Sequence, residues 1–525
     1  MATATNQHLP IILVRGFGGL DVSDEKRIAY QGFNNGTVYP GKRGENYIYE
    51  GMVLKFLKSD YTYYDATNVI GYYADAVTDH PEIPKELVDR NISEKFFTGD
   101  LVIDPATALA LVRRPPEQVR RTLWVFRYYD LQRKFTVYAE ALVRLIDFIR
   151  ALARVEGETP PMVNIIAHSM GGLIVREALQ ITYPGKNKNP EDFVNKVVTL
   201  GTPHRGITFQ LLSKWVGVDA DDELNRFNPQ NQENERWPGS YKDLHKHFDP
   251  RRILTVVGTN YRTYDNRISS GLNRLFSAGG EFGPLYNRSD GLVKQHSAQL
   301  PGAPRTFVHK CHGGEDSLVT SREAYEIASR FFFGDVLVRL RLLTAEIKHG
   351  ADPLGGSEFF LGASIKARDV DFELFHQSRD AENCYGPYRR ATLDDAEQGA
   401  EVAFPPLPDW TLWEGWMDRS RVTRDTGDLV FRLELYVAER DSFGVRFSDD
   451  VILHRQLFVR VAPKDGGTVQ EGIGGISWTE NPRLSSDGTL GKEAEPINGD
   501  GNGWRISLDY ADFSATFAIE LKPAG

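Results

Sequence analysis

A serine placed between an apolar run and a helical pattern is the feature that most constrains how this chain folds. The run Met162–Ala167 leads through His168 into Ser169, and apolar residues then follow at helical spacing at Leu173, Ile174, Val175 and Leu179. The neighbours Ala167 and Gly171 are small, as a tight turn from a strand into a helix requires. A serine on such a turn presents its Oγ to a neighbouring base. The sequence therefore predicts that Ser169 is a nucleophile.

A serine between a strand and a helix also has a plainer interpretation, as the N-cap of the helix. Its oxygen then accepts a hydrogen bond from the first helical turn and takes part in no reaction. The preceding His168, the small neighbours and the apolar run favour the nucleophile over the cap.

Short apolar runs alternate with helical patterns from residue 9 to about residue 335, which is typical of a parallel sheet covered by helices. The runs are Pro10–Val14, Leu123–Tyr128, Met162–Ala167, Lys196–Leu200, Ile253–Val257 and Thr306–His309. An amphipathic stripe between the second and third runs predicts a helix, at Leu142, Leu145, Ile146, Ile149 and Leu152. We expect residues 1–335 to form an α/β domain, with helices on both faces of its sheet.

Two segments of this half fit neither pattern. Residues 30–73 are dense in tyrosine, and residues 205–250 begin with an apolar stripe before becoming acidic and rich in asparagine. Both are expected to be insertions between strands, where substrate-shaping loops and lids usually lie. Leu211, Leu212 and Trp215 in the second insertion are candidates for the apolar face of a lid that binds substrate, with core packing as the alternative.

Beyond residue 335 the period changes to two, which predicts an antiparallel β-sandwich over residues 336–525. The alternating stretches are Val336–Leu342, Leu429–Val437, Leu453–Val461, Trp504–Tyr510 and Ala515–Leu521. Three tryptophans, Trp410, Trp413 and Trp416, suggest an exposed surface that contacts a lipid surface or a partner protein, although such a cluster is equally typical of a core. The role of this domain is not specified by its sequence.

Length and composition exclude several classes of protein. A chain of 525 residues exceeds what one core usually holds, and its net charge of -10 disfavours nucleic acid as a partner. The two cysteines, Cys311 and Cys384, are expected to be buried free thiols, because they lack metal-ligand or disulfide spacing. The sequence has no signal-peptide pattern and no apolar run of about 18 residues. We expect a cytoplasmic protein, or a secreted one that is leaderless or trimmed.

A nucleophilic serine needs a base and a carboxylate that orients the base, and in this type of domain they follow in the order Ser, Asp, His. Asp290 lies in a polar turn before an apolar stretch, and His312 follows the last predicted strand of the first domain. Other residues compete for both roles: His204, His296 and His309 for the base, and Asp265 and Asp316 for the carboxylate.

An ester-cleaving serine also needs backbone N–H groups for the developing oxyanion. The helix that opens at Met170 offers one set of unpaired N–H groups. The glycine-rich stretch Arg15–Gly19, which follows the first predicted strand, offers a second. Its glycines do not match the pattern of a dinucleotide-binding loop.

Four stretches together resemble the bacterial triacylglycerol lipases of the α/β-hydrolase superfamily: Arg15–Gly19, Ala167–Gly172, Gly201–Gly206 and Ser289–Val293. The resemblance covers about residues 9–335. It implies an α/β-hydrolase fold, with Ser169 as nucleophile, His312 as base, Asp290 as orienting acid, the amides of Phe17 and Met170 as oxyanion hole and a structural His204.

The chain departs from the lipase pattern at three positions. Arg15 stands where these lipases usually have histidine, so the hydrogen bonding of that loop is expected to differ. Ala167 replaces the first glycine of the serine motif. Gly314 stands where relatives with a calcium site place an aspartate, so we expect no metal and no cofactor.

The sequence thus predicts a lipase or esterase that cleaves a lipid-like acyl ester through a covalent acyl-enzyme. An acyltransferase or thioesterase would use the same three residues with a different acyl acceptor or bond. A protein of another class, which binds through its β-sandwich and has an inactive hydrolase frame, is disfavoured by the intact serine, aspartate and histidine.

Overall fold

The computed structural model describes most of the two predicted domains. The described residues are 8–16, 50–66, 70–77, 83–90, 92, 96, 99–103, 105–126, 134–206, 241–261, 289–313, 316–348, 357–368, 370–378, 383–388, 410–421, 428–440, 450–464, 469, 472–481, 491–497 and 502–524. The chain divides into two compact units. The first comprises Met1–Pro304 and Lys310–Ala328, and the second comprises Arg305–His309 and Ser329–Gly525.

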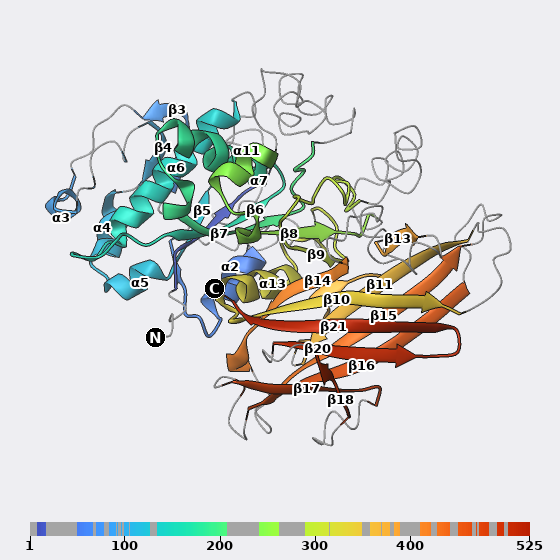
Figure 1. The fold of residues 1–525 in the computed structure, drawn as a ribbon. Helices are drawn as coiled ribbons and strands as arrows, with labels where there is room; N and C mark the ends of the chain where they lie inside the picture. The colour runs from blue at the N-terminus through green and yellow to red at the C-terminus, as the bar shows by residue number, and fades with distance from the viewer. Residues whose placement is uncertain are drawn as a thin grey trace, which may run out of the picture. The chain divides into compact units, whose positions relative to one another are not determined.

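A parallel sheet forms the centre of the first unit (Figure 1). Six of its strands run in the order β2-β5-β1-β6-β7-β8, and the pairs between these six are parallel. Their bounds are β1 Ile11–Val14, β2 Tyr64–Asp65, β5 Thr122–Phe126, β6 Val163–His168, β7 Val194–Leu200 and β8 Ile253–Gly258. Every residue of β1, β5, β6 and β8 is buried, as expected for strands covered on both faces.

Helices cover both faces of this sheet. The amphipathic helix α6 (Phe135–Leu152) packs on α7 (Met170–Glu177) on one face, and α2 (Glu50–Leu57) lies on the other (Figure 1). A π-helical turn (Ala178–Thr182) extends α7. The remaining helices are α3 Lys85–Val88, α4 Pro105–Val112, α5 Pro116–Arg120, α8 Tyr183–Gly185, α11 Tyr241–His247 and α13 Arg322–Phe333, and β3 (Ile70–Val77) pairs with β4 (Gly99–Ile103).

The register of the strands brings the ends of β1, β6 and β7 together. Val14 pairs with Ala167, and His168 pairs with Leu200. The residues that follow these strands therefore lie side by side at the carboxyl edge of the sheet, where open α/β sheets bind their ligands. Ser169 and Gly201 begin two of these connections.

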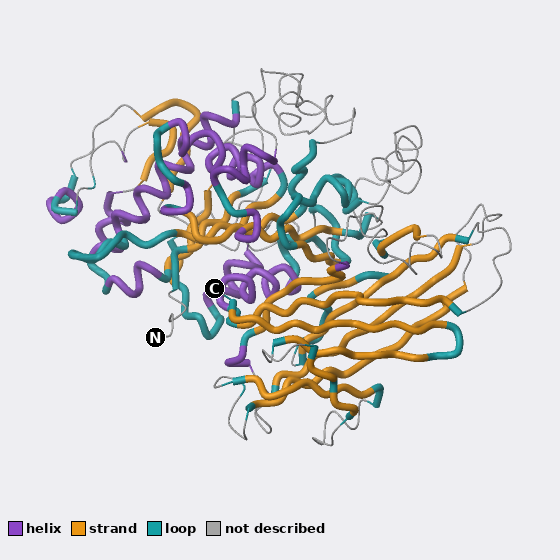
Figure 2. The backbone as a smooth tube through the Cα atoms, viewed as in Figure 1, coloured by secondary structure: helices purple, strands orange, loops and turns teal. Residues whose placement is uncertain are grey.

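Antiparallel sheets make up the second unit, which is almost entirely strand (Figure 2). One sheet has the order β14-β10-β21-β20-β19, and the other has β12-β11-β15-β16-β17-β18, with β13 also on β11. Side chains alternate between buried and partly exposed along β10 and β21. The bounds are β10 Val336–Ile347, β11 Glu358–Ala367, β12 Phe375–His376, β13 Tyr385–Tyr388, β14 Thr411–Met417, β15 Leu429–Arg440, β16 Asp450–Pro463, β17 Ile473–Thr479, β18 Lys492–Glu493, β19 Glu495–Pro496, β20 Gly503–Asp509 and β21 Phe513–Pro523.

The short strand β9 (Arg305–Val308) belongs to the second unit although it precedes residue 335, where the period of the sequence changes. Phe307 is buried, and its ring centroid lies 5.6 Å from that of Phe375. The Thr306 hydroxyl donates a hydrogen bond to the Leu374 carbonyl at 2.7 Å. These contacts come from a segment that the sequence pattern assigns to the α/β domain.

The three tryptophans proposed as an exposed contact surface are buried, so that interpretation of them is wrong. Trp410, Trp413 and Trp416 are only 4%, 3% and 9% exposed. The ring of Trp416 packs edge-on against Phe331 at 4.6 Å, and that of Trp410 lies 5.3 Å from Tyr388. Tryptophan buries more apolar area than any other side chain, and here that area stabilises the core.

The fold-class prediction is confirmed: the first unit has the parallel sheet and helices of an α/β-hydrolase, and the second is an antiparallel, sandwich-like domain. Cys311 and Cys384 are buried free thiols. Among the helices in the described part of the chain, none is both long enough and apolar enough to cross a membrane.

Candidate active site

Ser169 lies on the turn between β6 and α7 with a strained backbone. Its φ of 52° and ψ of -128° fall in a region that residues other than glycine rarely adopt. Its side chain makes no capping hydrogen bond to α7, so the N-cap interpretation is wrong. The Oγ instead lies 2.9 Å from His312 Nε2.

Gly171 allows the turn to form so close to β1. A Cβ at this position would collide with the carbonyl oxygen of Arg15 and would lie 2.8 Å from that of Val14. Since both obstacles are backbone atoms, neither is able to rotate away. The small residue after the serine therefore lets α7 start directly against the end of β1.

His312 lies between Ser169 and Asp290. Its Nδ1 is 2.8 Å from Asp290 Oδ2, and its Nε2 is 2.9 Å from Ser169 Oγ. Since an ionised carboxylate only accepts hydrogen bonds, Nδ1 carries the proton and Nε2 has a lone pair facing the serine hydroxyl. The three residues are 4%, 5% and 1% exposed for His312, Ser169 and Asp290, respectively. This arrangement allows the imidazole to accept the hydroxyl proton of Ser169.

Asp290 is held by the turn that follows it. Its Oδ1 accepts hydrogen bonds from the backbone N–H of Leu292 at 3.1 Å and of Val293 at 2.8 Å. Its own carbonyl accepts the backbone N–H of His312 at 2.8 Å. One carboxylate oxygen is thereby bound to the turn, while the other faces the imidazole.

Gly201, which follows β7, leaves space for this pair. Its φ is +56°, and a Cβ here would lie 2.8 Å from Asp290 Oδ2 and 3.1 Å from His312 Nδ1. A larger residue would therefore press on the two atoms that share the proton. The glycine needed here begins the Gly201–Gly206 stretch.

His168 contacts His312 from the strand that carries the serine. Its Nε2 lies 3.0 Å from the His312 carbonyl oxygen, and the two rings are 4.7 Å apart. Burial, reinforced by the neighbouring His312, holds the pKa of His168 well below its usual value, so this ring is neutral. Sequence reasoning did not find this contact, because 144 positions separate the two residues.

The other candidate bases and carboxylates lie elsewhere. His309 is exposed and follows the end of β9, rather than lying inside a strand as expected. His204 is fully buried, with its Nε2 3.1 Å from Thr199 Oγ1 and its carbonyl bound by Arg176. Burial and the cations Arg205 and Lys294 lower the pKa of His296 to about 4. Asp316 pairs with Lys310 at 2.7 Å.

Several predicted residues lie outside the described part of the chain. They are Phe17 of the oxyanion loop, Leu211, Leu212 and Trp215 of the lid-like insertion, Asp265 and Gly314. Met170 is described and begins α7, so its backbone N–H has no acceptor within the helix. Arg15 is buried, and its backbone N–H donates to the Phe126 carbonyl at 3.2 Å.

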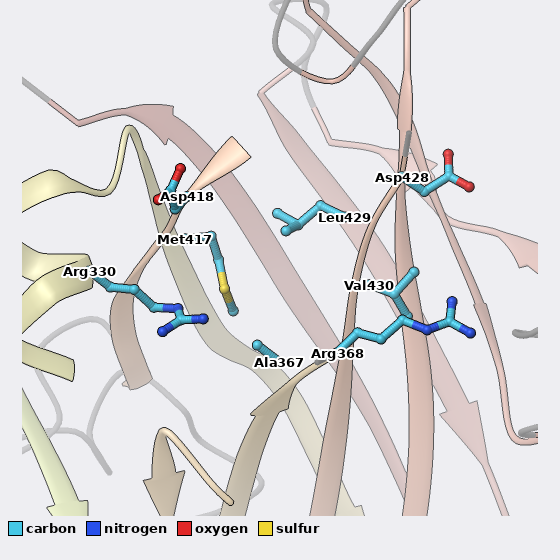
Figure 3. Close-up of a pocket in the computed structure, with 8 residues that line it drawn as sticks. All are labelled: Arg330, Ala367, Arg368, Met417, Asp418, Asp428, Leu429 and Val430. Carbon is cyan, nitrogen blue, oxygen red and sulfur yellow. The ribbon is translucent and has the colours of Figure 1, made fainter. Parts of the chain in front are cut away.

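Within the described ranges, no group of three or more His, Cys, Asp or Glu side chains is arranged to hold a metal ion. A cavity in the second unit has a volume of about 10 Å³, close to that of one water molecule (Figure 3). It is lined by Arg330, Ala367, Arg368, Met417, Asp418, Asp428, Leu429 and Val430. This cavity is too small for an acyl chain.

Residues 131–257 match a family model described as the PGAP1-like alpha/beta domain. This segment resembles that domain. The prediction of an α/β-hydrolase relative is confirmed by the match, which includes Ser169 but neither Asp290 nor His312. No curated protein matches the chain.

The matches among solved structures include three hydrolases. A metagenomic carboxyl esterase has 14% identity and a TM-score of 0.28, and the match covers 59% of this chain and 65% of the esterase, just under two thirds of its length. The phospholipase PlaB from Legionella pneumophila has 13% identity and a TM-score of 0.29, covering 60% and 78%. A putative cell surface hydrolase from Lactobacillus plantarum has 10% identity and a TM-score of 0.30, covering 62% and 91%. These likenesses are too low to carry an argument about activity.

Proposed function

We propose that this protein hydrolyses carboxylic esters with Ser169 as nucleophile, His312 as general base and Asp290 as the residue that orients His312. The observation that carries the proposal is the position of His312, whose two ring nitrogens lie 2.9 Å from Ser169 Oγ and 2.8 Å from Asp290 Oδ2. The strained backbone of Ser169 supports it, because such strain persists where the surrounding structure holds it for a function.

In the first half of the reaction, His312 Nε2 accepts the proton of Ser169 while Oγ attacks the ester carbonyl carbon. The resulting tetrahedral intermediate collapses when the bond to the leaving alcohol breaks, and His312 gives its proton to the alcohol oxygen. The acyl group stays on Ser169. In the second half, His312 deprotonates water, which attacks the acyl carbon, and the acid leaves as the proton returns to Ser169.

The oxyanion of each intermediate needs N–H donors, and we assign this role to the backbone amides of Met170 and Phe17. Met170 lies at the start of α7, where its N–H has no acceptor within the helix and the helix dipole is positive. Each such donor lowers the barrier by about 3 kcal/mol. No step requires a metal or a cofactor.

Labelling with a fluorophosphonate probe tests the nucleophile. We expect the wild type to be labelled and Ser169→Ala not to be. The matched control is Ser321→Ala, because Ser321 is a buried serine whose Oγ does cap a helix, accepting the N–H of Ala324 at 3.1 Å. The control should keep its labelling and lose about 1 kcal/mol of stability. Labelling that survives Ser169→Ala would exclude the proposal.

The substrate class is tested by hydrolysis of nitrophenyl esters of increasing chain length. We propose a lipid-like acyl ester as substrate, so kcat/KM should increase from the acetate to the octanoate. Each buried methylene adds about 0.8 kcal/mol of transfer free energy, which sets the upper limit of the increase. A preference for the acetate would instead indicate a short-chain esterase.

A further inference from the structure

The ring of His168 is enclosed between two pieces of backbone. On one side its Nε2 lies 3.0 Å from the His312 carbonyl oxygen. On the other side is Gly16, where a Cβ would lie 2.7 Å from His168 Nδ1 and 2.9 Å from the Cβ of Ser169. Because a carbonyl oxygen only accepts, Nε2 must be the nitrogen that carries the proton.

Three hydrogen bonds connect the backbone and ring of His312 to two different parts of the fold. Its backbone N–H and its Nδ1 both bind Asp290, at 2.8 Å in each case. Its carbonyl binds His168. The first two bonds fix His312 relative to the turn of Asp290, whereas the third fixes it relative to β6, the strand that leads into Ser169.

We infer that His168 is a positioning residue, whose hydrogen bond to the His312 carbonyl sets the distance between the base and the nucleophile. This inference rests on the proposed ester hydrolysis at Ser169. Without the bond, the segment of His312 loses this link to β6, and we expect it to move together with the turn of Asp290 relative to Ser169. Such a shift lengthens the Nε2–Oγ distance of 2.9 Å and leaves the bond between His312 and Asp290 intact.

Only one of the two ring nitrogens of His168 is needed for this role. Among the described residues its Nδ1 has no hydrogen-bond partner, and the neutral ring places no charge beside His312. A side chain that offers a single N–H at the place of Nε2 should therefore substitute. Glutamine meets this requirement, whereas phenylalanine fills the space without a donor.

The test compares His168→Phe with His168→Gln. We expect His168→Phe to lower kcat for nitrophenyl butyrate about 10- to 100-fold, as displacement of a reacting group by about 1 Å does, with KM within about twofold. The rate of fluorophosphonate labelling should fall by the same factor. His168→Gln should recover most of both losses. The matched controls are His309→Phe and His309→Gln, because His309 is an exposed histidine three positions before His312.

A kcat of His168→Phe within about twofold of the wild type would overturn the inference, as would a folded His168→Gln that is as impaired as His168→Phe. If His168→Phe does not fold, His168→Asn replaces it, since its shorter amide reaches the place of Nδ1 and not that of Nε2. Nitrogen-15 shifts of the histidine rings give a readout that does not depend on activity. They should show Nε2 of His168 protonated, and a protonated Nδ1 would overturn the inference. Wild-type protein that is not labelled at all would instead refute the proposed function.

Discussion

Asp290 uses its two carboxylate oxygens for different purposes. Oδ1 accepts two backbone N–H groups of its own turn, and Oδ2 faces Nδ1 of His312. The backbone donors fix which oxygen faces the imidazole. The proton of His312 is therefore held on Nδ1, and the lone pair of Nε2 is kept toward Ser169.

The different partners of the two Asp290 oxygens predict the outcome of the substitution Asp290→Asn. The amide oxygen will take the place of Oδ1, because only an acceptor satisfies the N–H groups of Leu292 and Val293. The amide NH₂ then faces His312 and favours the tautomer with its proton on Nε2. We expect kcat to fall about 10⁴-fold, the size of the loss from the same substitution in a serine protease. Steady-state kinetics and the melting temperature, which should change little, are the measurements.

Asp316→Asn is the control for this substitution, since Asp316 is an exposed carboxylate paired with Lys310. It should leave kcat unchanged. If Asp290→Asn retained kcat within tenfold of the wild type, Asp290 would not be the group that sets the tautomer of His312.

A glycine of the candidate site follows one end of strand β7, and a lysine with a lowered pKa lies near the other end. Gly201 follows its carboxyl end, beside Asp290 and His312. Near its amino end, burial and the neighbouring Arg252 lower the pKa of Lys196 to about 8. Arg252 is itself fixed by hydrogen bonds to the carbonyls of Val194 and Asn195, both at 2.6 Å. The element therefore contains a lysine whose charge opposes folding.

The lowered pKa of Lys196 predicts that the free energy of unfolding rises with pH. Below about pH 8 the amine is charged in both states, and the folded state bears the cost of its burial. Between pH 8 and the ordinary value of 10.5 the unfolded state binds more protons than the folded state, so the free energy of unfolding increases. From pH 7.5 to 9.5 this residue should contribute about 2 kcal/mol.

Urea unfolding of wild type and Lys196→Met at the two pH values measures this contribution. The variant should be more stable than the wild type at pH 7.5, and its stability should change less with pH. Lys186→Met, at an exposed position, should keep the wild-type dependence. Equal pH dependence in wild type and Lys196→Met would contradict the lowered pKa.

The elements found from the sequence are those with a strong local pattern. Continuous apolar runs predicted β1, β5, β6, β7 and β8 to within a few residues. Strand β11 was not predicted, because Gly362, Ala363 and Ser364 interrupt its apolar pattern. Trp410, Trp413 and Trp416, in and just before β14, suggested an exposed contact surface, because the sequence does not show which residues pack over them.

The candidate site follows the same rule. Ser169 is predicted from a local motif, and Asp290 and His312 are predicted from the order Ser, Asp, His expected in this type of domain; their roles stay predictions. The contact between His168 and His312 depends on the register of distant segments, which no local pattern encodes. The roles of Phe17, Leu211, Leu212 and Trp215 stay predictions.

At the scale of the whole molecule, the two units are interleaved along the chain. Arg305–His309 belongs to the second unit, whereas the residues before it and Lys310–Ala328 after it belong to the first. The segment therefore lies between Asp290 and His312 in sequence. The domain boundary at residue 335 is placed where the period of the sequence changes, and it stays a prediction. Strand β9 lies before this boundary, whereas its contacts with Leu374 and Phe375 lie after it.

A chain truncated after Asp335 is expected to be unstable and inactive. It lacks Leu374, Phe375 and Tyr385, which contact Thr306 and Phe307 in the second unit. Exposure of a buried phenylalanine costs about 1.5–3 kcal/mol, a substantial part of a typical stability of about 5–15 kcal/mol. Fluorophosphonate labelling and thermal unfolding of the truncated and full chains are the measurements.

Phe307→Ala in the full chain should lie between the wild type and the truncated chain. We expect a lower melting temperature than that of the wild type and slower fluorophosphonate labelling. A truncated chain that is labelled at the wild-type rate and melts at the wild-type temperature would show that β9 needs no partner from residues 336–525.

Gly171, two positions after Ser169, has a consequence for how related sequences are sorted. At position 171 any Cβ meets carbonyl groups of β1, so the turn that strains Ser169 and a side chain at this position are incompatible. A descendant that has lost its chemistry no longer benefits from that turn, and it is free to relax the backbone and accept alanine or serine there. We therefore expect glycine at this position in relatives that use the serine, and other small residues in relatives that retain only the architecture.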